Sequence, residues 1–210
     1  QGFRARGLKL GKGMATNPAI KPEVTSGGIK YGSAASGVLH MGELFYQQVL
    51  VQPFDALKVK DTLSRCYLCL LFALKNPPTA FLGNFPMVIL LICKILEDYG
   101  EHLIKDIEKG TIAPWLQLTP EIRRSLEGKL YPDPNLAYKL REILKSEGKL
   151  TPISAMPSLA FYGTARGGTS DFYLERFPEY FGDIPGFGFV FSSAEGTFSI
   201  YPDLNTDGSI

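Results

Sequence analysis

The order of short apolar runs and longer amphipathic stretches near the end of the chain constrains its fold most strongly. Ser158–Gly163 (SLAFYG) is typical of a buried strand, Ser170–Gly182 (SDFYLERFPEYFG) of a helix, and Gly186–Ser193 (GFGFVFSS) of a second strand. Strands joined through a helix pair in parallel far more readily than as a hairpin. The succession therefore predicts an α/β fold with parallel or mixed sheets flanked by helices.

Helical periodicity dominates the middle of the chain. Apolar residues recur at three- and four-residue spacing, between clear start and stop signals, over residues 55–75, 86–110, 119–128 and 131–148. The sequence Asn76–Pro78 (NPP) ends the first of these stretches, and Gly100 is the expected site of a kink in the second. Between them, Thr79–Phe85 reads as a short buried strand.

The first 42 residues carry glycines and little helical periodicity, which favours short strands and loops. Thr25–Gly37 is glycine-rich but lacks the spacing of a phosphate-binding loop, so a structural loop is the better interpretation. The chain opens at Gln1 and ends in an Asp-Gly turn, from which we expect a fragment. We interpret residues 1–210 as one incomplete domain, with a glycine-rich part (1–54), a mainly helical part (55–150) and a β-α-β part (151–210).

Charge and cysteine content exclude several classes of function. Lys plus Arg (22) balances Asp plus Glu (21), so nothing indicates a nucleic-acid or membrane partner. The longest apolar run, Phe85–Cys93, is about half the ~20 residues that a membrane helix needs, and no signal peptide opens the chain. Cys66 and Cys69 have CxxC spacing without a second ligand pair, so with Cys93 we expect buried, reduced thiols in a cytoplasmic protein.

Two histidines leave little room for a metal cluster or a catalytic triad. We expect ordinary surface or core roles for His40 and His102, and no Gly-x-Ser-x-Gly, His-x-x-His or GxGxxG motif occurs. One constellation remains. The loop Thr164–Ser170 (TARGGTS) follows a predicted strand, and an aromatic residue, two hydroxyls and a carboxylate follow the next one. Ligands of α/β sheets bind outside the carboxyl ends of strands, where such loops gather.

Each residue of this constellation has a chemical use. Gly167 and Gly168 would let the backbone approach a flat ring closely, and Phe191 could stack on that ring. Ser192 and Ser193 could bind phosphate, and Glu195 could hold Mg²⁺, which takes oxygen ligands beside substrate phosphates. The structural alternative is that the segment merely caps a following helical turn, with Glu195 near its positive end.

From Thr79 to Ile210 the chain resembles the auxin-responsive (Gretchen Hagen) acyl-acid amido synthetases. They belong to the acyl-adenylating superfamily, with acyl-CoA synthetases and luciferases. The resemblance follows four segments in order, which are Leu91–Pro114 (LICKILEDYGEHLIKDIEKGTIAP), Leu130–Leu144 (LYPDPNLAYKLREIL), Ser158–Pro185 and Val190–Gly196 (VFSSAEG). The last is similar to the family's Tyr-Ala-Ser-Ser-Glu adenylation motif, with Phe and Ala194 in place of Tyr and the second Ser.

The resemblance implies the central part of the large N-terminal domain of an acyl-adenylating enzyme that uses ATP and Mg²⁺. Phe191 would pack on adenine, Ser192 and Ser193 would lie in the phosphate-facing turn, and Glu195 would be the catalytic metal ligand. The other wall of the adenine site would be the loop of Thr164, Ala165, Arg166 and Gly167. The family's upstream phosphate loop and C-terminal lid have no counterpart in these residues, so we expect the chain alone to be inactive.

The implied reaction has two halves. A small carboxylic acid attacks MgATP to give an acyl-adenylate and pyrophosphate, and an amine or amino acid then displaces AMP to form an amide. Two alternatives remain open, which are an acyl-CoA ligase-type adenylate-forming enzyme and a non-catalytic binding or scaffold relative.

Overall fold

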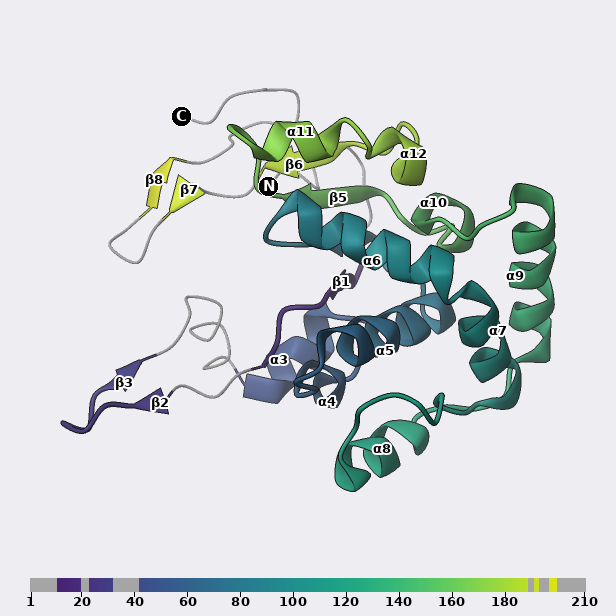
Figure 1. Cartoon of the computed structure of the whole chain (residues 1–210), viewed down its shortest axis with the longest axis horizontal. Helices are drawn as coiled ribbons and strands as arrows, with labels where there is room; N and C mark the ends of the chain where they lie inside the picture. Colours follow the sequence, from purple (N-terminus) through teal and green to yellow (C-terminus); the bar gives the residue numbers. More distant parts are fainter. Residues whose placement is uncertain (1–10, 20–22, 32–41, 189–190, 193–196, 200–210) are drawn as a thin grey trace.

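A four-stranded parallel sheet runs through the computed structural model, which describes residues 11–19, 23–31, 42–188, 191–192 and 197–199. Its strands are β1 (Gly13–Ala15), β4 (Ala80–Leu82), β5 (Phe161–Thr164) and β6 (Gly186–Gly188). The strand order is β1-β4-β5-β6, and each neighbouring pair is parallel (Figure 1). Helices flank this sheet, which confirms the predicted α/β fold.

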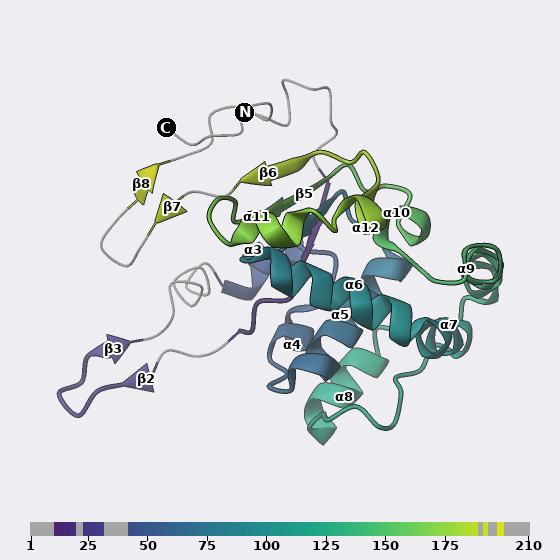
Figure 2. The same cartoon turned by 45° about the horizontal axis from the view of Figure 1, so that its top comes forward.

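Two antiparallel strand pairs lie outside this sheet. β2 (Glu23–Val24) pairs with β3 (Lys30–Tyr31), and β7 (Phe191–Ser192) pairs with β8 (Thr197–Ser199). The β2–β3 hairpin stands away from the body in both views (Figures 1 and 2). Its turn, where Thr25 Oγ1 accepts a hydrogen bond from Ile29 N at 3.0 Å, lies in the glycine-rich stretch that was expected to be structural.

Two expectations for the end of the chain are wrong. The run Gly186–Ser193 is not one strand, because β6 joins the parallel sheet whereas β7 pairs with β8 in a separate one. No helical turn follows directly after Gly196, because Thr197–Ser199 form β8. A helical turn at residues 197–199, which the capping alternative would need, is therefore absent.

The predicted helix over residues 55–75 is divided in two. α3 (Gly42–Val49) precedes it, and the stretch itself forms α4 (Phe54–Leu57) and α5 (Thr62–Lys75). The division is at Asp61, whose side chain caps α5 by accepting a hydrogen bond from Ser64 N at 2.8 Å. An N-cap residue lies outside helical φ and ψ, so a new helix has to begin there.

The second predicted helix breaks at Tyr99, next to the expected kink at Gly100. α6 (Pro86–Asp98) ends and α7 (Gly100–Lys109) begins where Tyr99 leaves helical geometry at φ −111° and ψ 16°. α7 ends as predicted at Gly110, which has φ 66° and whose added Cβ would meet the backbone nitrogen of Pro132 at 2.6 Å. Glycine is required there for both reasons.

The remaining helices are shorter. α8 (Pro120–Glu127) starts after Thr119, the first residue of the predicted stretch, and α9 (Pro134–Glu147) starts within the predicted stretch 131–148. The side chains of Thr119 and Asp133 cap these helices by accepting from Ile122 N and Leu136 N. α10 (Pro152–Ala155) follows, and the helix predicted over Ser170–Gly182 is divided into α11 (Ser170–Leu174) and α12 (Pro178–Phe181). Pro178 begins α12 at a position where the ring is tolerated.

The core is centred on α5, in which every side chain from Ser64 to Leu74 is buried. α5 packs against α6 and α7, and α7 packs against α9 (Figure 2). Cys66, Cys69 and Cys93 are all buried, as the sequence predicts, and burial raises the pKa of the Cys69 and Cys93 thiols. No described helix has the length and apolar character needed to cross a membrane.

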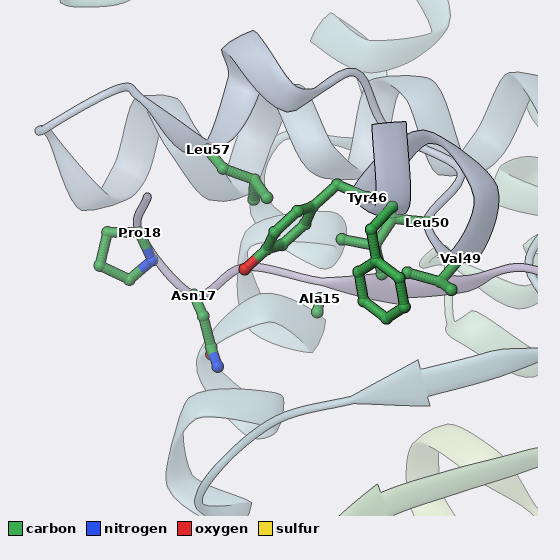
Figure 3. Close-up of a pocket in the computed structure, with 8 residues that line it drawn as sticks. Ala15, Asn17, Pro18, Tyr46, Val49, Leu50 and Leu57 are labelled. Carbon is green, nitrogen blue, oxygen red and sulfur yellow. The ribbon is translucent and has the colours of Figure 1, made fainter. Parts of the chain in front are cut away.

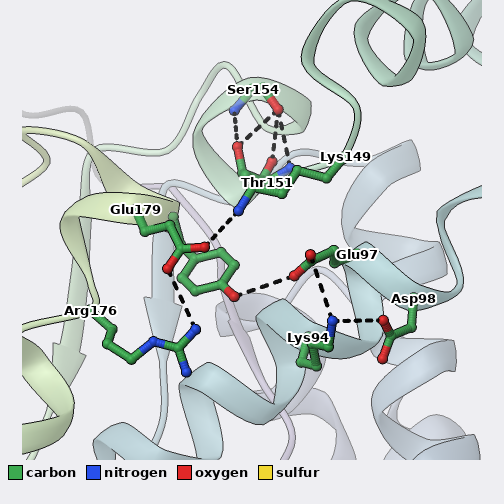
Figure 4. Close-up of polar contacts among 9 residues, drawn as sticks. Lys94, Glu97, Asp98, Lys149, Thr151, Ser154, Arg176 and Glu179 are labelled. Carbon is green, nitrogen blue, oxygen red and sulfur yellow. Dashed lines mark hydrogen bonds and ion pairs between the residues drawn. The ribbon is translucent and has the colours of Figure 1, made fainter.

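A polar network fastens α12 to α6 and to the start of α10 (Figure 4). Lys149 Nζ lies 2.6 Å from Glu179 Oε1, and the Tyr180 hydroxyl lies 3.3 Å from Glu97 Oε2. A reciprocal capping box between Thr151 and Ser154 starts α10. Because the charged side chains are partly exposed, this network adds little stability, and it mainly fixes the orientation of α12.

Candidate functional site

All four strands of the main sheet point the same way, so their carboxyl ends meet at one edge. We call this the carboxyl edge and define it by Thr16–Asn17 after β1, Gly83–Asn84 after β4, and Thr164–Gly168 at the end of β5. The strands stay connected beyond their paired residues. Gly83 N donates to Gly163 O at 3.0 Å, and Ala165 N donates to Asn84 O at 3.3 Å.

The predicted loop begins in the sheet interior and then emerges. Thr164 is fully buried, and its hydroxyl oxygen has no hydrogen-bond partner within the described residues. Ala165 and Arg166 are half-buried, and the loop then becomes exposed. Burial raises the pKa of Tyr162 on β5, and the nearby positive charge of Arg166 opposes that rise.

Gly167 and Gly168 have the backbone that the loop requires. Their φ values are 91° and 58°, a region in which residues with a side chain are strained. A Cβ added to either one would meet nothing within 4 Å, so space beside the loop is open with respect to the described residues. Gly167 N donates to Asp171 Oδ1 at 3.0 Å, which holds the loop against the start of α11.

The second half of the predicted constellation starts close to this loop. Thr164 and Gly188 are register partners on neighbouring strands, and Phe191 follows Gly188 by three residues. At 3.8 Å between consecutive Cα atoms, Gly188 and Phe191 lie within about 11 Å of each other. Figure 2 shows β7 beyond the end of β6. Of the predicted residues here, the backbone of Phe191 and Ser192 is described, whereas Ser193, Ala194 and Glu195 lie outside the described residues.

Two asparagines at the carboxyl edge were not predicted as site residues. Asn17 Nδ2 donates to Asn84 Oδ1 at 3.0 Å, which joins the ends of β1 and β4. The sequence did carry a signal, because MATN and FLGN each place an Asn two residues after a short strand. The strand expected over Thr79–Phe85 included Asn84, because the local sequence does not show that the strand ends before this residue.

An apolar pocket lies beside Asn17 (Figure 3). It has a volume of about 180 Å³ and is lined by Ala15, Asn17, Pro18, Phe45, Tyr46, Val49, Leu50 and Leu57. Burial against this wall raises the pKa of Tyr46, whose ring packs against Phe54 with centroids 5.1 Å apart. An apolar pocket of this size holds a small hydrophobic group, with one polar wall at the carboxyl edge.

The described residues contain no group of three or more His, Cys, Asp or Glu side chains placed to hold a metal ion. His102 is exposed on α7 beside the rings of Tyr99 and Trp115, in keeping with an ordinary surface role, and His40 lies outside the described residues. At the carboxyl edge the structure thus combines an open glycine loop with a buried hydroxyl that has no partner among the described residues.

Solved structures share this fold. The chain matches one described as "GH3.15 acyl acid amido synthetase" with a TM-score of 0.77 and 21% identity, over 92% of this chain and 35% of that one. It matches "AtGH3.15 acyl acid amido synthetase in complex with 2,4-DB" with a TM-score of 0.74 and 20% identity, over 91% of this chain and 34% of that one. The chain thus spans about a third of the length of these structures. No curated protein matches it at a significant level.

The comparison that reaches beyond fold is with protein families. The profile described as "GH3 family N-terminal domain" matches residues 1–186, which is most of the chain and includes β1, β4, β5 and the loop at Thr164–Gly168. The match therefore covers the three strands whose ends build the carboxyl edge. The chain belongs to the GH3 family.

Proposed function

We propose that this chain is part of an ATP-dependent acyl acid amido synthetase, which adenylates a small carboxylic acid and joins it to an amine or amino acid. Family membership supports the reaction class, and the solved structures with this fold are described as acyl acid amido synthetases. One of those relatives is described in complex with 2,4-DB. We further propose that residues 1–210 form one incomplete domain of that enzyme, since strands from all three of its parts share the main sheet.

The single observation that carries the proposal is the arrangement of the carboxyl edge. The glycine loop that follows β5 and the strand β7 that follows β6 arise from register partners in adjacent strands. A nucleotide base fits between an open glycine backbone on one side and an aromatic side chain on the other. Thr164 adds a buried hydroxyl with no partner in the described part of the chain, next to where that base would lie.

Each residue has a proposed role. Phe191 stacks on adenine, while Thr164, Ala165, Arg166 and Gly167 form the opposite wall. Ser192 and Ser193 donate to phosphate oxygens, and Glu195 binds Mg²⁺. When bound, the metal ion neutralises negative charge that builds on the phosphates. The chain's own contribution is to orient the nucleotide at the end of the sheet, where two neighbouring strands fix the positions of its walls.

The apolar pocket beside Asn17 supports a carboxylic acid as the second substrate. Its lining is mainly hydrocarbon and aromatic, and it includes Asn17, a residue of the carboxyl edge. We propose that the hydrocarbon part of the acid lies in this pocket while its carboxylate faces the nucleotide. A volume of about 180 Å³ suits a small acid rather than a long acyl chain.

The experiment that tests the proposal is Glu195→Gln in the whole protein. The exchange keeps the shape of the side chain and removes the charge that would face Mg²⁺. We expect ATP–pyrophosphate exchange to fall at least roughly 10²-fold, equivalent to about 2.7 kcal/mol of transition-state stabilisation. The melting temperature should stay close to that of the wild type, and added Mg²⁺ should restore part of the rate.

A matched control is Glu142→Gln, because Glu142 is exposed on α9, remote from the carboxyl edge. It should leave exchange unchanged. Exchange that survives Glu195→Gln at ordinary Mg²⁺ would remove Glu195 from the site. A wild type that forms acyl-CoA but no amide would favour an acyl-CoA ligase, and a wild type that shows no exchange with any acid would indicate a non-catalytic relative.

A further inference from the structure

We propose that Asn17 and Asn84 are a positioning pair that holds the Ala165–Gly167 loop at its place on the carboxyl edge. Neither side chain is proposed to touch the nucleotide. The pair acts through the loop, so its effect on the ligand rests on the proposed function, whereas its effect on the loop does not. The argument begins with the register of the sheet.

The register puts three residues on one rung. Ala15 pairs with Leu82, and Leu82 pairs with Gly163, so these are the last aligned residues across β1, β4 and β5. Two residues further along each chain are Asn17, Asn84 and Ala165. Side chains along a strand alternate between the two faces of the sheet. Residues two positions further along therefore lie on the same face as the aligned residues before them.

On that rung, Asn84 is bonded on both sides. Its side-chain oxygen accepts from Asn17 Nδ2 at 3.0 Å, and its backbone oxygen accepts from Ala165 N at 3.3 Å. Asn84 is exposed, and Asn17 is half-buried. The side-chain amide of Asn17 thus continues the connection between β1 and β4 beyond Ala15, the last residue of β1 that pairs with β4.

The segment that carries Asn17 is firmly anchored to the core. Arg65 on α5 is only 7% exposed, and its Nε donates to Thr16 O at 2.9 Å. The same guanidinium donates to Val59 O at 2.8 Å, and Ala19 N donates to Leu57 O at 2.7 Å. Asn17 therefore lies on a segment fixed to the core on both sides, and it can restrain a neighbour.

The Ala165–Gly167 loop, at the other end of this hydrogen-bonded connection, needs such a restraint. Gly167 and Gly168 have positive φ and open space around the position of a Cβ, so side-chain packing does not hold the loop there. Besides the bond to Asn84, the described anchors of the loop include Gly167 N on Asp171 Oδ1 and the turn bonds into α11. Without the Asn17–Asn84 hydrogen bond, Asn84 at the end of β4 is held less firmly. The loop that is bonded to Asn84 through Ala165 N then opens more often.

Trypsin cleavage after Arg166 measures this opening without reference to any ligand. Cleavage of a loop that opens and closes rapidly reports the population of the open form. Asn84→Ala and Asn17→Ala should each raise cleavage at Arg166–Gly167 by about two- to tenfold, the range that one neutral hydrogen bond commands. The double variant should add nothing further, because both changes remove the same bond.

Conservative variants give an asymmetric test. Asn84→Asp keeps an acceptor for Asn17 and should cleave no faster than the wild type, whereas Asn84→Leu keeps a side chain of similar size, loses the acceptor and should cleave like Asn84→Ala. The control is Asn135→Ala, because Asn135 is exposed at the start of α9. Equal cleavage in all variants overturns the proposal that the Asn17–Asn84 pair holds the loop. So does a rise at every trypsin site together with a lower melting temperature, which would mean ordinary structural damage.

Kinetics separates positioning from structure. In ATP–pyrophosphate exchange at saturating acid, Asn84→Ala should raise the KM for ATP by about two- to tenfold and leave the kcat at saturating ATP unchanged. Raised cleavage with an unchanged KM for ATP, in an active wild type, overturns the link between the loop and the nucleotide. If the wild type shows no exchange, the proposed function fails, and the cleavage results still decide whether the pair holds the loop.

Discussion

Around α5, every side chain from Ser64 to Leu74 is buried, and α4, α6 and α7 pack against it. At the carboxyl edge, the strands are three or four residues long, Asn84 is exposed, and Gly167 and Gly168 have open space beside them. The first region is held by close packing from many directions. The second is held by individual hydrogen bonds between the ends of strands.

This difference assigns stability and ligand binding to different residues. Losses in the packed helical region are costly because neighbouring side chains cannot close the gap or re-pair buried polar groups. At the carboxyl edge, polar groups such as the Thr164 hydroxyl are left without described partners, which is unfavourable for folding alone and useful for a ligand. Substitutions in the two regions should therefore differ in size and in kind.

The largest expected loss comes from Asp106→Ala in α7. The buried carboxylate accepts from the Tyr67 hydroxyl at 2.7 Å, Ala113 N at 2.8 Å and Thr111 Oγ1 at 3.1 Å. Alanine leaves at least two buried donors unpaired, at about 1–3 kcal/mol each, so we expect a loss of about 3 kcal/mol or more in the free energy of unfolding. Urea denaturation measures it. Asp106→Asn should cost less, and equal losses for Asn and Ala would contradict this account.

A smaller loss is expected at the opposite, amino end of the sheet, from Gly186→Ala. A Cβ on Gly186 would lie 2.3 Å from two ring carbons of Tyr162. That ring is packed against Phe177 and Phe181, with centroids 4.8 and 5.0 Å away, so it cannot move freely. We expect destabilisation of about 1–3 kcal/mol in thermal or urea unfolding. An unchanged protein would mean that the amino end is as open as the carboxyl edge.

A comparable or smaller change is expected at alkaline pH. Burial, together with the hydrogen bond to Asp106, raises the pKa of Tyr67 above its usual value near 10. In the unfolded chain Tyr67 loses its proton at about pH 10, whereas the folded protein keeps it, so stability is full below pH 10 and falls above it. The fall approaches about 1.4 kcal/mol per pH unit. Tyr67→Phe should flatten this part of the stability profile, and an equally steep profile would contradict the assignment.

The smallest expected effect belongs to the carboxyl edge, in Thr164→Val. This change removes a fully buried hydroxyl that has no partner among the described residues and nearly keeps the side-chain shape. Stability should be unchanged or raised by up to about 1 kcal/mol, because no hydrogen bond is lost. A loss above about 1 kcal/mol in urea denaturation would show that the hydroxyl is already satisfied, and the contrast between the two regions would weaken.

The same contrast decides how much the sequence could predict. Caps act over three or four residues, so Thr119, Gly110 and Gly148 marked helix ends that the structure confirms. The Asp61 cap, which divides a predicted helix, is an equally local hydrogen bond. It was not predicted because the apolar periodicity continues across Asp61. The split between β6 and β7 was missed because it depends on which partner strand each one finds, and that choice is non-local.

For the site, the sequence predicted the place better than the partners. The loop Thr164–Gly167 does lie at the carboxyl edge, next to the strand that leads to Phe191. The roles of Ser193 and Glu195 remain predictions outside the described residues. Asn17 and Asn84 went unnoticed because their contact depends on a register between strands far apart in the sequence, which no local pattern encodes.

The strand order β1-β4-β5-β6 also determines when during folding the carboxyl edge can exist. β1, at residues 13–15, pairs first with β4 at residues 80–82, and β4 pairs next with β5 at residues 161–164. Contacts between distant segments form slowly, whereas helices such as α5 and α7 form from local ones. During synthesis the helical region can condense while β1 waits for its neighbours. We expect the nascent chain to gain affinity for its proposed ligand late, once β5 has docked, so ligand binding would report a late step in the folding of the described sheet.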